Sequence, residues 1–266
     1  MDVGPTDYVE SRYRGEEVVD RGRNSIAIPG LVDCHTHTQQ LLLRSAIEGE
    51  LLALPPIWTK LLVPFESRLS RDLAYISSLA SAASMVRNGT TFFIEAGAPY
   101  PDAVAQAAEE VGVKAAVTPS FFNVVNGRAA EEPSSVREKL LAVRRLRGRF
   151  SGPWCSVCQV MMVVPELLEE VAEVCRDDAF SGLTMHLAEY QVEVDYTLTL
   201  AGVRPLEFVE QLGLLDIGKP VVLAHGVYLS PDEARTIARR GNVSVCWCPT
   251  VDSWLMGLHW LGLGFV

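Results

Sequence analysis

The chain has 266 residues, of which 48% are hydrophobic and 21% are charged, a composition that is typical of a globular protein and excludes extended disorder. Its 33 acidic residues outnumber the 23 basic residues, and the resulting formal net charge of −10 repels phosphate backbones and anionic lipids. The composition therefore argues against nucleic acids and membrane surfaces as partners.

The N-terminal residues contain no apolar stretch of the signal-peptide kind, and no uncharged apolar run reaches the length of about 18 residues that a membrane span needs. We therefore expect a cytoplasmic protein without a membrane span. In such a chain, cysteines are expected to be free thiols. Four of the cysteines are closely spaced along the chain: Cys155 and Cys158 form a C-x-x-C motif, and Cys246 and Cys248 form a C-x-C motif. These motifs leave a thiol-based zinc or redox site open as an alternative.

Short β-rich segments alternate with helical patterns at intervals of roughly 30 residues, which is typical of βαβ units. In chain order, the sequence predicts strands over 26–32, 90–95, 113–119, 154–163, 182–186, 221–225 and 242–248. Turn residues and helix-starting prolines predict the intervening helices over 71–88, 101–111, 134–147, 165–176, 205–212 and 231–240.

Seven such units in about 225 residues predict an α/β fold, a (β/α)₈ TIM barrel of parallel strands, with an open doubly wound sheet as the alternative. Only the segment from Leu258 to Val266 remains for an eighth strand, and no closing helix can follow it. We therefore expect a barrel that is incomplete at its C-terminus.

Four of the five histidines lie at the C-terminal ends of predicted strands, the edge that carries the active site in a barrel of parallel strands. Residues at i and i+2 of a strand point the same way, so His35 and His37 can bind one ion. With His186 they would supply the three protein ligands that are typical of a catalytic zinc site.

Two further residues at this edge are candidates for the chemistry. Glu189, in the segment HLAE, is the candidate acid and base that moves a proton from water to a leaving group. His225, in AHGVYLS, would hydrogen-bond the attacking water or polarise the substrate. The alternative interpretations are a solvated loop carboxylate and a packed strand-end histidine.

Four sequence motifs, in this order along the chain, resemble those of the amidohydrolase superfamily: PGLVDCHTHTQQLLLRSAI, NGTTFFIEAG, MHLAEY and RPLEFVEQLGLLDIGKPVVLAHGVYLSPDEA. Within it, they resemble the group of S-adenosylhomocysteine/methylthioadenosine deaminases and chlorohydrolases, with guanine deaminase close to that group. The resemblance extends from about Glu16 to about Gly257.

The resemblance implies a metal-dependent hydrolase that deaminates a purine nucleoside-like or related nitrogen heterocycle, or alternatively a triazine chlorohydrolase. It implies one divalent ion, zinc first and iron second, with the ligands His35, His37 and His186. It also implies Glu189 as proton shuttle and His225 as the group that orients water or substrate. Substrate contacts are expected from Glu189, His225 and Trp58.

The sequence departs from the family pattern at both ends. The Asp that completes the family's metal site after strand eight is absent, and the nearby Asp252 stands where relatives usually carry Asn, so it would need a rearranged loop to bind metal. Residues 1–28 are expected to be a remnant of the family's β-sandwich and residues 29–266 the hydrolase barrel. A catalytically impaired barrel that binds metal or ligand, and a homo-oligomer that covers exposed apolar surface, follow as alternatives.

Overall fold

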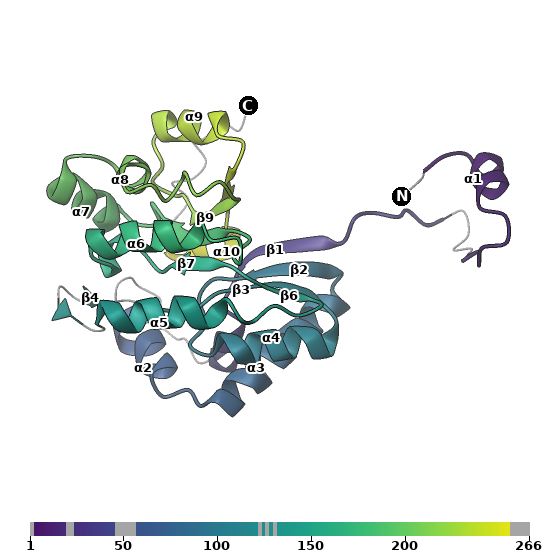
Figure 1. The fold of residues 1–266 in the computed structure, drawn as a ribbon, viewed down its shortest axis with the longest axis horizontal. Helices are drawn as coiled ribbons and strands as arrows, with labels where there is room; N and C mark the ends of the chain where they lie inside the picture. Colours follow the sequence, from purple (N-terminus) through teal and green to yellow (C-terminus); the bar gives the residue numbers. More distant parts are fainter. Residues whose placement is uncertain are drawn as a thin grey trace.

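A computed structural model describes residues 3–19, 24–45, 57–121, 124–125, 128–129 and 132–255. Near the N-terminus a short helix, α1 (Thr6–Arg12), lies away from the main body on an extended segment (Figure 1). The described residues 16–19 and 24–28, where a remnant of a sandwich strand was expected, belong to no strand. The division into residues 1–28 and 29–266 remains a prediction.

Two four-stranded parallel sheets form the centre of the molecule (Figure 1). The first has the order β1 (Leu31–Thr36), β2 (Thr90–Glu95), β3 (Lys114–Val117) and β6 (Ser151–Pro153). The second has the order β7 (Cys155–Val157), β8 (Leu183–Leu187), β9 (Val221–His225) and β10 (Val243–Cys246). All five residues of β8 are buried, as expected for a strand covered on both faces.

The two sheets adjoin within one continuous segment of chain, because β6 and β7 are separated only by Trp154. The backbone N–H of Trp154 donates to the carbonyl oxygen of Val117 in the first sheet (2.9 Å), and that of Cys155 donates to Gly182 beside the second (2.9 Å). A Cβ at Gly182 would lie 2.7 Å from the Trp154 indole, so only glycine leaves room for this ring. The strands therefore follow one another in chain order around a curved parallel array.

Helices alternate with the strands, and many start at a proline that needs no hydrogen-bond partner for its nitrogen. They are α2 (Val63–Glu66), α3 (Arg71–Arg87), α4 (Pro101–Val111), α5 (Pro133–Val143), α6 (Pro165–Cys175), α7 (Gln191–Ala201), α8 (Pro205–Gln211), α9 (Pro231–Arg239) and α10 (Pro249–Leu255). Shorter elements are the 3₁₀ turns η1 (Thr38–Leu43) and η4 (Val160–Met162), the π turn η3 (Ile57–Leu62) and the hairpin of β4 (Val124–Val125) and β5 (Arg128–Ala129). The largest apolar core lies between β7, β8 and β9 and the helices α5, α6 and α8.

The predicted α/β class with parallel strands is confirmed, with local corrections. The strand predicted over 26–32 begins only at Leu31, because Pro29 lacks a donor for the ladder. The strand predicted over 154–163 ends at Val157 and continues into η4. Helix α7 was not predicted. The expected eighth strand, 258–266, lies outside the described residues.

One expectation about the cysteines is wrong. Cys155 of β7 and Cys175 at the end of α6 form a disulfide, because the crossover from β7 to α6 brings their Cα atoms within 6.0 Å. The C-x-x-C pair is therefore not available as two free thiols. Cys34, Cys158, Cys246 and Cys248 are free.

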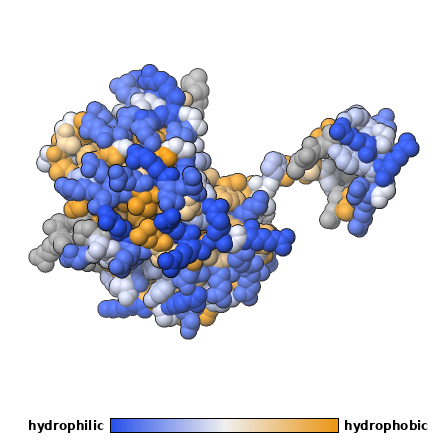
Figure 2. Space-filling view, in the orientation of Figure 1, coloured by the Kyte–Doolittle hydropathy of each residue, from blue (hydrophilic) through white to orange (hydrophobic). Residues whose placement is uncertain are grey.

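Apolar surface is visible where the extended N-terminal segment joins the body (Figure 2). Ile26, Ile28, Leu31 and Val32 are all more than half exposed there. Among the described residues, no helix is long and apolar enough to span a membrane.

Candidate metal centre and active site

Four histidines meet at the carboxyl edge of the strands. His35 lies in β1, His37 directly follows β1, His186 lies in β8 and His225 ends β9. The ring centroid of His35 lies 5.1 Å from that of His37, 4.7 Å from that of His186 and 5.2 Å from that of His225. The structure thus brings together all four histidines that the sequence places at strand ends.

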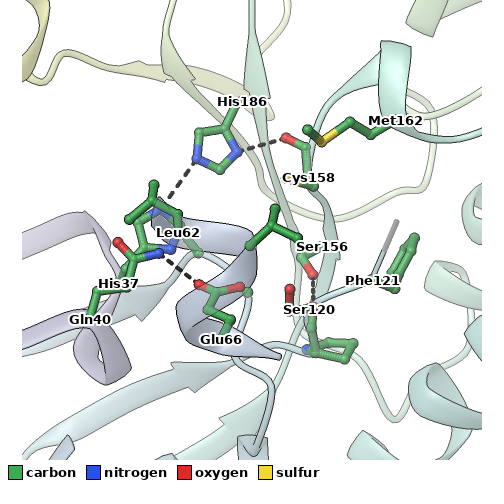
Figure 3. A pocket seen from close by; sticks show the side chains of 14 residues that line it. His37, Gln40, Leu62, Glu66, Ser120, Phe121, Ser156, Cys158, Met162 and His186 are labelled. Atoms are coloured by element: carbon green, nitrogen blue, oxygen red, sulfur yellow. Dashed lines mark hydrogen bonds between the residues drawn. The ribbon is translucent and has the colours of Figure 1, made fainter. Parts of the chain in front are cut away.

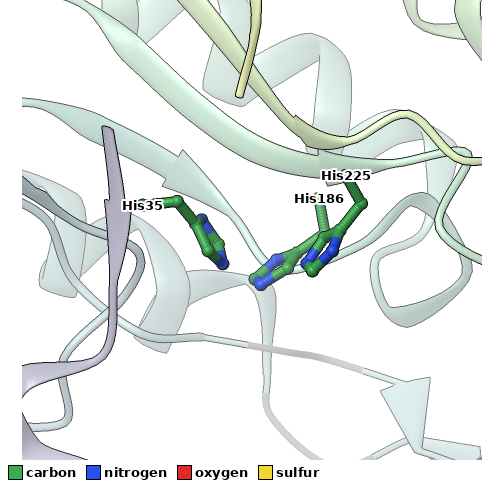
Figure 4. A group of neighbouring side chains, drawn as sticks. All are labelled: His35, His186 and His225. Atoms are coloured by element: carbon green, nitrogen blue, oxygen red, sulfur yellow. The ribbon is translucent and has the colours of Figure 1, made fainter. Parts of the chain in front are cut away.

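Three of these rings present nitrogens to one point in space (Figure 4). One ring nitrogen from each of His35, His186 and His225 lies within 4.8 Å of the others, and no further group of three or more potential ligands meets in this way among the described residues. The Nε2 of His37 lies 3.3 Å from the Nε2 of His186. This group contains His35 and His186 of the set expected from the sequence, and it has His225 in place of His37.

The state of these nitrogens fits a divalent cation. The Nδ1 atoms of His35 and His37 are buried and have no hydrogen-bond partner, a condition that costs ~1–3 kcal/mol for each group unless a ligand relieves it. Burial, reinforced by the neighbouring imidazoles, lowers the pKa of His37 to about 4 and the pKa of His35 and His186 well below the usual range. These rings are neutral at neutral pH, the form in which imidazole binds zinc and related ions.

Hydrogen bonds behind the rings fix the orientation of two of them. The Nδ1 of His186 donates to the carbonyl oxygen of Cys158 (2.6 Å), which leaves Nε2 free for the centre. The Nδ1 of His225 lies 2.7 Å from the Oδ1 of Asp252. Partners of this kind set the tautomer and the direction of a metal-binding imidazole.

Glu189 lies at the same edge, two residues after the end of β8. Its Oε1 lies 3.6 Å from the Nε2 of His225, and its Oε2 accepts a hydrogen bond from the Nε2 of Gln159 (2.7 Å). Burial raises the pKa of Glu189 to about 6, although the charge of His225 and the hydrogen bonds oppose the shift. A carboxylate with this pKa can both accept and release a proton near neutral pH.

A second buried carboxyl group, that of Glu193, holds the backbone of Glu189 in place. The Oε2 of Glu193, in α7, accepts the backbone N–H of Glu189 at 3.0 Å. Burial raises the pKa of Glu193 to about 8, so this group is mostly protonated at neutral pH. Burial lowers the pKa of His225, but the carboxylates of Glu189 and Asp252 outweigh it and raise that pKa overall.

The backbone is unusual at both strand ends. Ala188, directly after β8, has φ +49°, and His225, the last residue of β9, has φ +71°. Residues other than glycine seldom adopt this left-handed conformation, and such positions cluster at functional sites. The turn is fixed by the N–H of Gly226, which donates to the carbonyl oxygen of Leu187 (3.1 Å).

Two cavities open onto the histidines. One lies beside His37 and His186 and contains the carboxylate of Glu66, which accepts a hydrogen bond from the Nε2 of Gln40 at 2.7 Å (Figure 3). The other has a volume of about 560 Å³, within the range of small-molecule sites, and is lined by His35, His225 and Glu189 among others. A small heterocycle therefore has room beside the imidazoles.

Sequence reasoning missed several of these residues. Gln159 follows β7 at the same edge as the histidines, so the rule that placed His186 there also points to it. Glu66, Glu193 and the contact of Asp252 with His225 depend on tertiary packing and leave no short-range signal. The side chain of the expected substrate residue Trp58 lies outside the described part of the structure.

Comparison with known proteins gives consistent matches. The profile of the amidohydrolase family matches residues 26–255. A 5-methylthioadenosine/S-adenosylhomocysteine deaminase of Moorella thermoacetica is 34% identical over 251 residues, which cover 93% of this chain and 56% of the relative. The chain thus spans about half the length of the curated relatives it matches.

Solved structures share the fold. A guanine deaminase of C. acetobutylicum with bound guanine superposes with a TM-score of 0.77 at 22% identity, covering 95% of this chain and 60% of that protein. An atrazine chlorohydrolase of Arthrobacter aurescens complexed with zinc gives a TM-score of 0.71 at 19% identity, covering 88% of this chain and 57% of that protein.

Proposed function

We propose that this chain, which belongs to the amidohydrolase family, carries the metal site of a hydrolytic deaminase that acts on a purine nucleoside-like or related nitrogen heterocycle. The observation that carries the proposal is the meeting of four imidazoles, two of which hold a buried nitrogen without a partner. The relative from Moorella, named for its action on adenosine derivatives, supports this substrate class.

In this proposal His35, His37 and His186 hold a single divalent ion, zinc first and iron second. When bound, the ion supplies a Lewis acid that lowers the pKa of water and makes it nucleophilic at neutral pH. The neutral state of the three rings suits this role, since each offers a lone pair.

Glu189 moves the protons. Its Oε1 accepts a proton from the attacking water and passes it to the heterocycle. The amino nitrogen takes up one of the two protons of water and leaves as ammonia, and the neighbouring ring nitrogen takes up the other, so that a C=O bond replaces the C–NH₂ bond. Its Oε2 is held by Gln159, which keeps the carboxylate directed at the centre. His225, 3.6 Å from Glu189, orients the water or the substrate. Trp58 stays a predicted substrate contact.

The test is ammonia release by zinc-loaded protein with 5′-modified adenosines, guanine and chlorinated triazines as substrates. We expect release from a nucleoside-like substrate and its loss after chelation or in His186→Ala. The variant Asp232→Asn, which changes an exposed residue outside the site, should match the wild type. Ammonia release that survives both chelation and His186→Ala contradicts the proposal, and chloride release from a triazine favours the chlorohydrolase alternative.

A second candidate is a barrel that binds metal but turns over poorly. It is favoured by the composition of the ligand group, which contains no carboxylate among the described residues. Zinc bound at one ion per chain without ammonia release on any substrate would support it. We also propose a homo-oligomer and a cytoplasmic location for this protein.

A further inference from the structure

Asp252 is a buried carboxylate near the centre that the proposed mechanism leaves unused. It lies in α10, and its side chain is only 3% exposed. Its Oδ1 lies 2.7 Å from the Nδ1 of His225, and its Oδ2 accepts the backbone N–H of Cys248 at 3.1 Å. Its own N–H donates to the carbonyl oxygen of Cys248 at 2.9 Å. The carboxylate is therefore held from two directions.

This geometry differs from that of a metal ligand. Nδ1 and Nε2 lie on opposite flanks of an imidazole, and the Nε2 of His225 is the atom that approaches Glu189. Asp252, on the Nδ1 flank, therefore lies behind the ring as seen from the centre. Both of its oxygens already accept hydrogen bonds, and it is not a member of the three-histidine group.

A neutral imidazole carries one N–H, and its partner decides which nitrogen bears the hydrogen. A carboxylate only accepts hydrogen bonds, so Asp252 places the hydrogen of His225 on Nδ1 and leaves the lone pair on Nε2. We propose that Asp252 is a positioning residue that fixes His225 in the Nδ1–H tautomer, with the Nε2 lone pair facing the centre. The tautomer itself does not depend on the proposed function. What the lone pair does, which is to orient water or substrate, rests on that function.

Asparagine, which relatives usually carry at this position, cannot accept both of the hydrogen bonds that Asp252 accepts in this chain. Asp252 accepts two hydrogen bonds, one on each oxygen, from His225 and Cys248. The amide of asparagine has one acceptor and one NH₂ group, so it must present a donor to one of these two donors. If the NH₂ group faces His225, the ring becomes an acceptor at Nδ1 and its hydrogen moves to Nε2. If it faces Cys248, the backbone anchor is lost.

The first experiment reads the tautomer directly. Long-range ¹H–¹⁵N NMR of histidine-labelled, metal-free protein at alkaline pH distinguishes the two nitrogens of each ring, and His225→Gln identifies the signals of His225. We expect the Nδ1–H form in the wild type and in the surface control Asp232→Asn, and a shift toward Nε2–H or an exchange-averaged signal in Asp252→Asn. An Nε2–H form in the wild type, or unchanged signals in Asp252→Asn, overturns the inference. Once His225→Gln has identified its signals, the wild-type spectrum decides even if Asp252→Asn does not fold.

The second experiment measures zinc affinity by chelator competition in a double-mutant cycle. His225 lies with His35 and His186 in the group of ring nitrogens that could hold an ion, so its orientation can affect zinc affinity as well as the water or substrate. Loss of a carboxylate behind such a histidine typically costs ~10- to 100-fold in affinity. We expect a loss of this size in Asp252→Asn and no further loss when the same change is made in His225→Gln. If Asp252→Asn lowers zinc affinity equally in the wild type and in His225→Gln, or lowers it in neither, Asp252 does not act through His225 and the inference is overturned. If the chain binds no zinc, the proposed function fails while the NMR result still tests Asp252.

Discussion

The buried carboxyl of Glu193 gives a prediction for stability that can be worked out from the structure. The side chain is fully buried, and burial raises its pKa from 4.5 to about 8. The unfolded chain ionises near the ordinary value and the folded chain only near pH 8. Below the unfolded pKa both states hold the proton, and the stabilising contribution is fully present. As the pH rises toward 8, the unfolded chain releases the proton while the folded chain keeps it, so the free energy of unfolding falls.

Glu193→Gln removes this dependence, because the amide has the shape of the protonated acid and does not ionise. Each pKa unit corresponds to about 1.4 kcal/mol, so between about pH 5 and about pH 7.5 the variant should gain roughly 3 kcal/mol relative to the wild type. The Oε1 of Glu193 has no partner, and an NH₂ group there carries a cost that is the same at both pH values. The cost cancels in the difference.

Urea unfolding of metal-free protein at the two pH values measures this difference. Asp195→Asn is the matched control, since Asp195 lies exposed on the same helix α7 and accepts a hydrogen bond from Gln191. The difference in the free energy of unfolding between the control and the wild type should be nearly the same at both pH values. A Glu193→Gln variant whose stability relative to the wild type is the same at both pH values would refute the assignment of a raised pKa to this burial.

Three further predictions concern the centre and its support. Metal analysis of His186→Ala should find the zinc content reduced from about one ion per chain to a small fraction, and full retention would contradict the ligand assignment. Glu189→Gln should keep its zinc and lose ~10²- to 10⁴-fold in kcat, and the wild-type fall of kcat/KM below about pH 6, where Glu189 becomes protonated, should be absent from the residual activity. Thr38→Val should lower the free energy of unfolding by ~1–3 kcal/mol, because the Thr38 hydroxyl bonds to the buried Glu95, and an unchanged urea midpoint would count against this.

The order of strands was readable from the sequence because each is a short apolar run between helix signals. The strand predicted over 221–225 coincides with β9. The family resemblance, based on four motifs, is confirmed by the matching profile. Helix α7 was missed because its apolar residues do not follow one face, and its buried positions include Glu193 and Thr197. Hydrophobic periodicity cannot find a helix that buries polar groups.

The site was partly readable for a similar reason. Parallel strands collect their carboxyl ends at one edge, so His35, His186 and His225 could be placed together without coordinates. The partners behind the rings could not, because Cys158 contributes a backbone carbonyl and Asp252 comes from a later helix. The disulfide between Cys155 and Cys175 was missed because the absence of a secretory signal argued for free thiols.

The left-handed backbone at His225 has a consequence for how such a chain can change over time. This conformation costs an L-residue roughly 1–2 kcal/mol, and glycine at the same position would relax it. The same change would leave the buried carboxylate of Asp252 without its ring partner, which costs ~1–3 kcal/mol or more. A glycine at the end of β9 is therefore a stabilising change only in a chain that has also replaced Asp252, so the two positions are expected to change together.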